Sequence, residues 1–153
     1  MSDSITVAPG DPRDPRATAL LQQSQNLMRA LFDPEENHFL EIDALSAPSI
    51  QFLVAREAER ILGCAALADR GAYGEIKSMF VDPAARGKGV AHLLMQGLEQ
   101  AARDRGLGVV KLETGDKLTE ARGLYRAHGF AECAPFGDYT ANATSVFMTK
   151  TLT

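Results

Sequence analysis

Two glycines and two cations stand close together in the middle of the chain, in residues 86–91, which read Arg-Gly-Lys-Gly-Val-Ala. Glycine has no side chain, so a large anion can approach the backbone there, and glycine adopts positive φ at little cost. The helical pattern that follows begins with backbone N–H groups that lack an intrahelical partner and carry a partial positive charge. Together with Arg86 and Lys88, these amides predict a binding site for a phosphate or diphosphate.

Two common phosphate-binding motifs are excluded by the residues at this loop. A P-loop requires Ser or Thr after its lysine, and Lys88 is followed by Gly89. The dinucleotide fingerprint requires a third glycine at the position of His92. The pattern that remains is Arg-x-x-Gly-x-Ala, formed by Arg86, Gly89 and Ala91. A plain turn between a strand and a helix, with glycines selected for packing, is the alternative.

The segments on either side of the loop have the composition of a strand and a helix. In residues 75–81, bulky and β-branched side chains alternate with polar ones, and Asp82-Pro83 ends the strand because proline has no N–H for a sheet. From Val90 to about Arg105, apolar residues recur at three- and four-residue steps, which predicts an amphipathic helix. The other predicted elements are strands at 4–8, 49–55, 60–68, 109–114, 130–133 and 145–151, helices at 17–32 and 118–128, and a short helix near 42–45.

This order of strand, Val81-Asp82-Pro83, loop and helix resembles the GNAT superfamily, the general N-acetyltransferases that use acetyl-CoA. The family's diphosphate loop usually reads Q/R-x-x-G-x-G/A after a strand that ends V-x-P. Residues 121–130 are similar to the family's A-x-x-L-Y-x-x-x-G-F helix, with Tyr125 at the tyrosine position. Where the family often has Asn seven residues before this tyrosine, the chain has Leu118. The segments around residues 112–115, 135–139 and 145–148 look like a bacterial subgroup of small-molecule acetyltransferases.

The element order predicts an α/β chain of the α+β type with a mixed sheet. The resemblance implies the GNAT fold, in which a mostly antiparallel central sheet of about six or seven strands is flanked by helices. We expect residues 1–153 to form a single domain, since this length can bury one core.

The resemblance also implies acetyl-CoA as co-substrate and a set of residues that bind it. The pantetheine pairs with the backbone of Met79 and Val81 like an added strand, and an N–H near Met79, freed by a bulge, binds the acetyl carbonyl. The predicted cofactor-binding residues are Met79, Phe80, Val81, Arg86, Gly87, Lys88, Gly89, Val90 and Ala91. No metal is expected, because the isolated His38 and His128 have no ligand spacing.

Acetyl transfer to an amine needs a base, because an amine of pKa ~10 is charged at pH 7 and its deprotonation costs ~4 kcal/mol. Glu75 is the first candidate, since the catalytic glutamate of the histone-acetylating branch occupies the same offset from its loop. In a regular strand Glu75, Lys77 and Met79 share one face, so an ion pair between Glu75 and Lys77 is the alternative. Glu113, which ends the neighbouring strand, is the second candidate base.

An acid for the departing thiolate and a place for the acceptor complete the predicted site. The resemblance places the hydroxyl of Tyr125 near the cofactor sulfur, and packing against Phe130 is its alternative. Lys77, Phe136 and Tyr139 are predicted to bind the acceptor, although aromatic packing beneath a long loop fits Phe136 and Tyr139 equally well. Residues 33–47 hold five carboxylates and no Lys or Arg, which either face solvent or attract a cationic acceptor. Those carboxylates are Asp33, Glu35, Glu36, Glu41 and Asp43.

The composition limits the partners and the compartment. A formal net charge of −4 argues against nucleic acid, and no apolar run approaches the ~20 residues of a membrane span. The N-terminus lacks a signal peptide, and Cys64 and Cys133 lie in apolar runs, so we expect buried reduced thiols in a cytoplasmic protein. A homodimer through residues 145–151 is considered, because many relatives dimerise through their closing strands.

The leading hypothesis is an acetyltransferase that moves an acetyl group from acetyl-CoA to an amine of a small molecule by direct attack in a ternary complex. One alternative is a non-catalytic acyl-CoA-sensing or interaction module with a GNAT fold. Another keeps the enzyme and changes the acceptor to a hydroxyl or a protein lysine. The sequence leaves the identity of the acceptor open.

Overall fold

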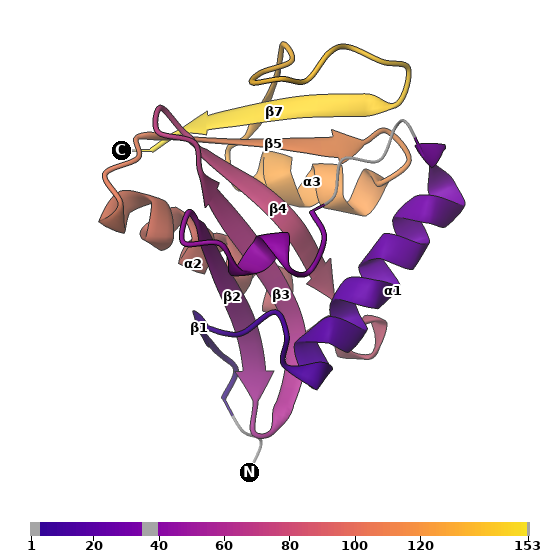
Figure 1. The fold of residues 1–153 in the computed structure, drawn as a ribbon, viewed down its shortest axis with the longest axis vertical. Coiled ribbons are helices and arrows are strands. Elements are labelled where there is room, and N and C mark those ends of the chain that lie inside the picture. The colour runs from indigo at the N-terminus through magenta and orange to yellow at the C-terminus, as the bar shows by residue number, and fades with distance from the viewer. Residues whose placement is uncertain (1–3, 35–39, 153) are drawn as a thin grey trace.

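The computed structural model describes residues 4–34 and 40–152, and its fold is drawn in Figure 1. Three residues that the sequence analysis singles out lie outside these ranges: Glu35, Glu36 and His38. No helix in the described residues has the length and the apolar character needed to cross a membrane.

Seven strands of the described residues form one sheet in the order β1-β2-β3-β4-β5-β7-β6. Their bounds are β1 Thr6–Pro9, β2 Ile50–Glu57, β3 Arg60–Asp69, β4 Gly74–Val81, β5 Val109–Gly115, β6 Ala131–Cys133 and β7 Ser145–Thr151. β4 and β5 run parallel, and the other neighbouring pairs are antiparallel. The predicted mixed, mostly antiparallel sheet is therefore confirmed.

Three α-helices in the described part of the chain accompany the sheet: α1 Pro15–Leu31, α2 Val90–Asp104 and α3 Thr119–Ala127. α1 begins as the sequence predicts, because the Asp14 side chain accepts a hydrogen bond from the Arg16 N–H and Pro15 needs no partner in the first turn. The short helix predicted near 42–45 is a single 3-10 turn at Ala44–Ser46, and a second such turn spans Pro83–Ala85.

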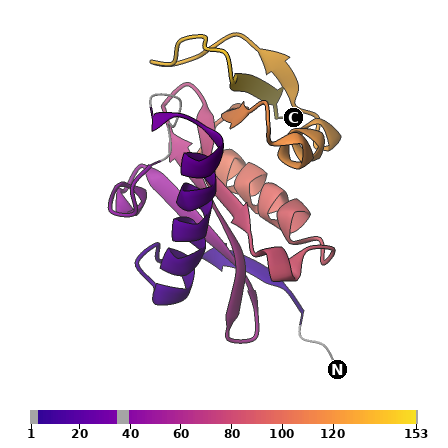
Figure 2. The same ribbon diagram turned by 90° about the vertical axis from the view of Figure 1, so that its right-hand side faces the viewer.

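The helices cover both faces of the sheet, as Figure 2 shows for α1 and α2. Leu94, Met95 and Leu98 of α2 pack in the core cluster on one face, and Leu20 and Leu21 of α1 pack in the cluster on the other. Because both faces are buried, β3 is apolar along its length instead of alternating. A central sheet covered in this way gives rigid strands on which a site can be built.

The sheet opens between β4 and β5. Their register contains three pairs, Gly74 with Val110, Glu75 with Lys111 and Ile76 with Leu112, and the strands then diverge, as Figure 1 shows. On its other side β4 has a bulge: Cys64 pairs with Phe80 and Ala66 with Lys77, so Ser78 and Met79 have no partner in that register. Ser78 has a φ of 56°, the left-handed conformation of a bulge residue.

The bulge overturns one prediction about the faces of β4. Glu75 and Lys77 share a face, but Met79 does not share it, because one extra residue inverts the alternation of side chains. Met79 and Val81 pack against the α2 cluster together with Ile76, whereas Phe80 packs against the α1 cluster. A regular strand would have placed Met79 beside Lys77.

The two cysteines are free thiols. Cys64 is fully buried in β3, and burial raises the pKa of its thiol to about 12, so it is inert near neutral pH. Cys133 is half-buried instead of buried as predicted, because β6 is a three-residue strand at the edge of the sheet.

Candidate active site

The predicted phosphate-binding loop lies at the N-terminus of α2. Gly87 and Gly89 have φ values of 84° and 76°, and Gly89 is the N-cap of the helix. A Cβ on either glycine would meet no atom within 4 Å, so the backbone there faces open space. Across the described residues, no protein acceptor takes a hydrogen bond from the backbone N–H groups between Gly87 and His92. These amides are thus available to an anion.

Both predicted cations of the loop are present, and each stands near a carboxylate. Arg86 Nη1 lies 3.8 Å from Glu120 Oε2 at the start of α3, and Lys88 Nζ lies 3.2 Å from Glu57 Oε1 at the end of β2. The Arg86 pair is exposed and contributes little to stability, so its guanidinium can turn to a bound phosphate at small cost. The pair also shows that the loop lies beside the start of α3.

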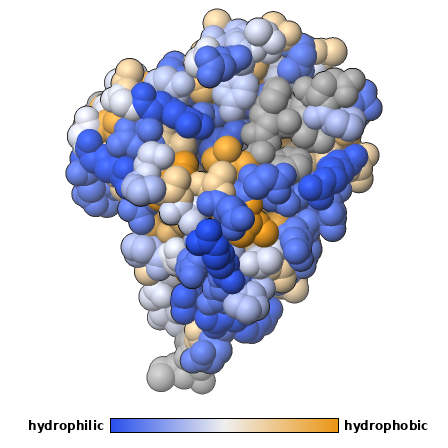
Figure 3. Space-filling view, in the orientation of Figure 1, coloured by the Kyte–Doolittle hydropathy of each residue, from blue (hydrophilic) through white to orange (hydrophobic). Residues whose placement is uncertain are grey.

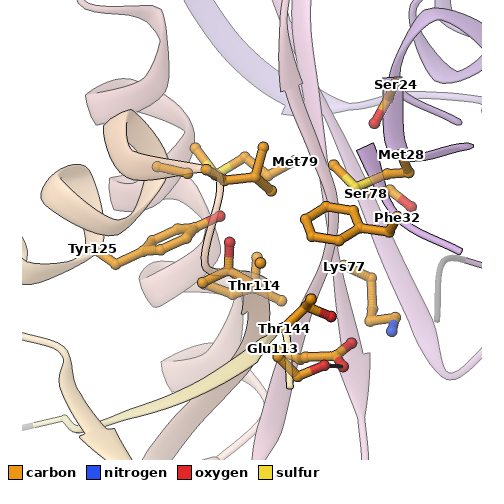
Figure 4. Close-up of a pocket in the computed structure, with 15 residues that line it drawn as sticks. Ser24, Met28, Phe32, Lys77, Ser78, Met79, Glu113, Thr114, Tyr125 and Thr144 are labelled. Carbon is orange, nitrogen blue, oxygen red and sulfur yellow. Dashed lines mark hydrogen bonds between the residues drawn. The ribbon is translucent and has the colours of Figure 1, made fainter. Parts of the chain in front are cut away.

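A pocket of about 140 Å³ lies where β4 and β5 diverge. Residues 76–79 of β4 and 113–115 of β5 form its sides, and α3 contributes Ala121 and Tyr125. Figure 4 shows Tyr125 reaching in from one side and Met28 and Phe32, from α1 and its end, closing the other. Figure 3 shows a few apolar side chains at the surface in the middle of this face, surrounded by hydrophilic ones.

Two of the three predicted catalytic residues line this pocket. Tyr125 is buried, its ring packs edge-on against Phe130 with centroids 6.0 Å apart, and burial raises its pKa to about 12. The sequence suggested either packing against Phe130 or access to the pocket for Tyr125. The structure shows both. Glu113 is half-buried and accepts a hydrogen bond of 2.7 Å from Ser145 Oγ.

Glu75, the first candidate base, does not line the pocket. Its side chain is 3% exposed, and Arg70 Nε donates to Oε1 over 3.1 Å. Oε2 accepts a hydrogen bond from the Tyr139 hydroxyl and lies 3.5 Å from Lys77 Nζ. The predicted ion pair with Lys77 therefore exists, and Arg70 and Tyr139 were not foreseen as its other members.

Lys77 is the predicted acceptor-binding residue that lines the pocket. Its ammonium donates to Tyr139 Oη over 2.8 Å, and burial lowers its pKa, an effect that Glu75 opposes. Tyr139 and Phe136 lie behind it and do not contribute to the lining. Their rings are 5.3 Å apart, and Phe136 also contacts Tyr73 and Phe147 edge-on. Phe136 is thus held by aromatic packing, the alternative to acceptor binding. Tyr139 contacts the pocket only indirectly, by accepting a hydrogen bond from Lys77.

The family model described as Acetyltransferase (GNAT) family matches residues 17–130, which include the loop, both sides of the pocket and Tyr125. The chain belongs to the GNAT acetyltransferase family. The IAA acetyltransferase of Azospirillum brasilense is 38% identical to this GNAT chain over 151 aligned residues, and the match covers 97% of the chain and 99% of that protein.

Solved structures share the fold of this GNAT chain. A protein of Klebsiella pneumoniae named as an acyl-CoA N-acyltransferase is 28% identical, with a TM-score of 0.81 over 97% of this chain and 98% of that one. A GNAT family acetyltransferase of Elizabethkingia anophelis has acetyl-CoA bound; it is 20% identical, with a TM-score of 0.72 over 98% of this chain and 99% of that one. At that identity the second likeness concerns the fold alone.

The loop of this GNAT chain fits a diphosphate by its own geometry, because Gly87 and Gly89 leave open the space that a Cβ would fill. Leu118, at the position where GNAT proteins often have Asn, is a half-buried residue of the pocket wall. It stands at the N-cap of α3 and supplies no side-chain hydrogen bond there. Leu118 therefore presents an apolar surface where an asparagine could form a polar contact.

The wall that α1 contributes to the pocket was not predicted from the sequence. Ser24, Met28 and Phe32 follow one another at four-residue steps, so they lie on one side of the helix and its end. That spacing is visible in the sequence, but only the packing of α1 on the sheet directs this side to the pocket. Gly115 was missed as well, although it gives Phe32 the room to close the pocket.

His128 is not isolated, contrary to the prediction. Its Nε2 lies 2.8 Å from Nδ1 of His92, in the first turn of α2, and its Nδ1 lies 3.9 Å from Glu99 Oε2. The two rings meet because α3 ends beside the start of α2. His92 and His128 are far apart in the sequence, which gives no sign of this contact. Among residues 4–34 and 40–152, no group of three His, Cys, Asp or Glu side chains could hold a metal ion.

Proposed function

We propose that this GNAT chain transfers the acetyl group of acetyl-CoA to an amine of a small molecule in a ternary complex. The observation that supports the proposal is the continuity of the site: the unpartnered amides of the loop, the β4 bulge and the pocket follow one another along residues 76–92. The amides of Gly87–His92, with Arg86 and Lys88, would hold the diphosphate. Acetyl-CoA supplies an activated thioester when it is bound.

The bulge provides the group that would polarise the thioester. Ser78 and Met79 have no partner in the register with β3, and β5 has already diverged at this point. An N–H held at Met79 by the sheet can donate to the acetyl carbonyl oxygen as negative charge develops on it. Rigid strands on both sides hold the two reactants in place, which itself lowers the barrier by several kcal/mol.

Glu113 is the base that we propose in preference to Glu75. Its carboxylate lies on the pocket wall, whereas both oxygens of Glu75 contact other side chains behind Lys77. Glu113 takes the proton of the substrate ammonium, the amine nitrogen forms the amide bond and the bond from carbon to sulfur breaks. Tyr125, whose raised pKa keeps it protonated at neutral pH, donates its proton to the departing sulfur. The second proton, which the nitrogen loses as the amide forms, restores the Tyr125 hydroxyl.

An acceptor screen with acetyl-CoA tests this function, with thiol release as the signal and thermal shift as a separate measure of binding. We expect turnover with at least one amine, and we expect Glu113→Gln to lower kcat by about 10²-fold or more. The Kd of acetyl-CoA should stay unchanged, because the carboxylate contacts the acceptor.

Glu59→Gln is the matched control, because Glu59 is fully exposed at the turn between β2 and β3. It should retain full activity. Acetyl-CoA binding without turnover of any amine would favour the non-catalytic module, and the absence of binding would refute the proposal at its first step. Full activity of Glu113→Gln would remove Glu113 as the base.

A further inference from the structure

The pocket has two charged residues of opposite sign among the described residues that line it, Lys77 and Glu113. The remaining described lining residues are apolar or neutral, among them Met28, Phe32 and Met79. Figure 4 shows the ends of Lys77 and Glu113 in the same part of the pocket, apart from Tyr125 and Met79. This part of the pocket, where we expect the acceptor, therefore carries one positive and one negative side chain.

The Lys77 ammonium is held in place at this wall. It is 8% exposed, donates to the Tyr139 hydroxyl over 2.8 Å and lies 3.5 Å from Glu75 Oε2. Glu75 also accepts from Arg70 over 3.1 Å, so one carboxylate is shared by two cations. Glu113 also attracts the Lys77 ammonium, and a ligand carboxylate at the wall would add a further acidic partner. Such a charge-assisted hydrogen bond in a buried setting is strong.

A simple amine is a poor match for this arrangement. It arrives as a cation, and while Glu113 attracts it, Lys77 repels it at short range. A molecule with an ammonium and a carboxylate can place its carboxylate at Lys77 and its ammonium at Glu113 at the same time. The repulsion by Lys77 then acts against amines that lack the acid, which is how a site discriminates between otherwise similar ligands.

We propose that the acceptor is an amino acid or a similar small zwitterion, whose carboxylate binds Lys77 and whose amine is presented to Glu113. This inference rests on the proposed acetyl transfer and adds the chemical class of the acceptor. The apolar residues Met28 and Phe32 on the α1 side would contact its side chain. Lys77 is then a binding residue for the acceptor, held by Tyr139 and Glu75.

Matched pairs of amino acid and decarboxylated amine test the proposal: phenylalanine with phenethylamine, leucine with isoamylamine, and 4-aminobutyrate with propylamine. The measurement is kcat/KM for each member with saturating acetyl-CoA. For at least one pair we expect the wild-type protein to favour the acid-bearing member by about tenfold or more, the effect of one hydrogen bond to a charged group. Lys77→Met should abolish this preference by lowering kcat/KM for the amino acid and not for the amine. Lys77→Arg should restore part of the preference.

Lys111→Met is the control, because Lys111 is a half-buried lysine on the neighbouring strand that does not line the pocket. It should leave the preference unchanged. Since Lys77→Met could fold poorly, competitive inhibition of the wild-type protein by 3-phenylpropionate, and none by 2-phenylethanol, gives an independent measure of carboxylate binding. Equal or better use of the plain amines by the wild type overturns the inference and leaves acetyl transfer intact. Acetyl-CoA binding with no turnover in either arm refutes the proposed function, and this inference with it.

Discussion

The ring of Phe32 occupies the space that a side chain on Gly115 would need, because a Cβ on Gly115 would lie 2.1 Å from Phe32 Cζ. This contact joins the end of α1 to the end of β5 and closes one side of the pocket. Lys117 strengthens the junction: its ammonium lies over the Phe32 ring and donates to the Leu31 carbonyl at the helix C-terminus.

Gly115→Ala should therefore displace Phe32, lower the free energy of unfolding by about 1–3 kcal/mol and lower kcat/KM for the acceptor. Urea unfolding and steady-state kinetics measure the two effects. Gly123→Ala is the control, since a Cβ there meets no atom within 4 Å and alanine stabilises a helix by about 0.5–1 kcal/mol. An unchanged stability for Gly115→Ala would mean that Phe32 is free to move.

Gly89→Ala should weaken acetyl-CoA binding. Alanine at a φ of 76° costs about 1–2 kcal/mol, and its Cβ would enter the space in front of the loop amides. We expect the Kd of acetyl-CoA, measured by calorimetry, to rise by about tenfold. Gly71→Ala separates the two causes, because Gly71 has a φ of 84° and equally open surroundings in the turn before β4. It should be strained but bind acetyl-CoA normally, and equal losses in both variants would contradict a diphosphate site at Gly89.

Glu75→Gln should affect stability first. It leaves Arg70 and Lys77 without their shared carboxylate, and breaking a buried pair in this way costs about 3 kcal/mol. Chemical denaturation measures the loss. Glu132→Gln is the comparison, because Glu132 is an exposed residue that pairs with Arg122 and Arg126 and should contribute less than about 1 kcal/mol. If Glu75→Gln were fully stable but inactive, Glu75 would return as the base.

His128 should make the protein less stable in mild acid. Burial, together with the neighbouring His92 and Lys150, lowers its pKa below the ordinary 6.5, and Glu99 opposes the shift. Below pH 6.5 the unfolded chain takes up a proton that the folded chain resists, so the free energy of unfolding falls as the pH drops toward the folded pKa. Denaturation at pH 7.5 and pH 5.5 should show the loss, and His128→Gln should reduce the difference. A difference of the same size in both proteins would contradict the role of His128.

The sequence alone determined the elements, the family and the conformation of the glycine loop, because their causes are local. Positive φ at Gly87 and Gly89, unpartnered amides at the start of a helix and proline after a strand all act within a few residues. Apolar periodicity likewise reports the buried side of each segment, and so the first residue of the helix that begins at Val90 was predicted correctly.

Only the tertiary structure decided which side chains meet in the pocket. The direction of Met79 depends on a bulge against β3, which a one-residue shift in pairing produces without a local signal. The hydrogen bond between Tyr139 and Glu75 spans 64 residues, and the contact between Gly115 and Phe32 depends on how α1 lies on the sheet. Such contacts form when distant segments bury a shared core, and the sequence around each residue does not contain their register.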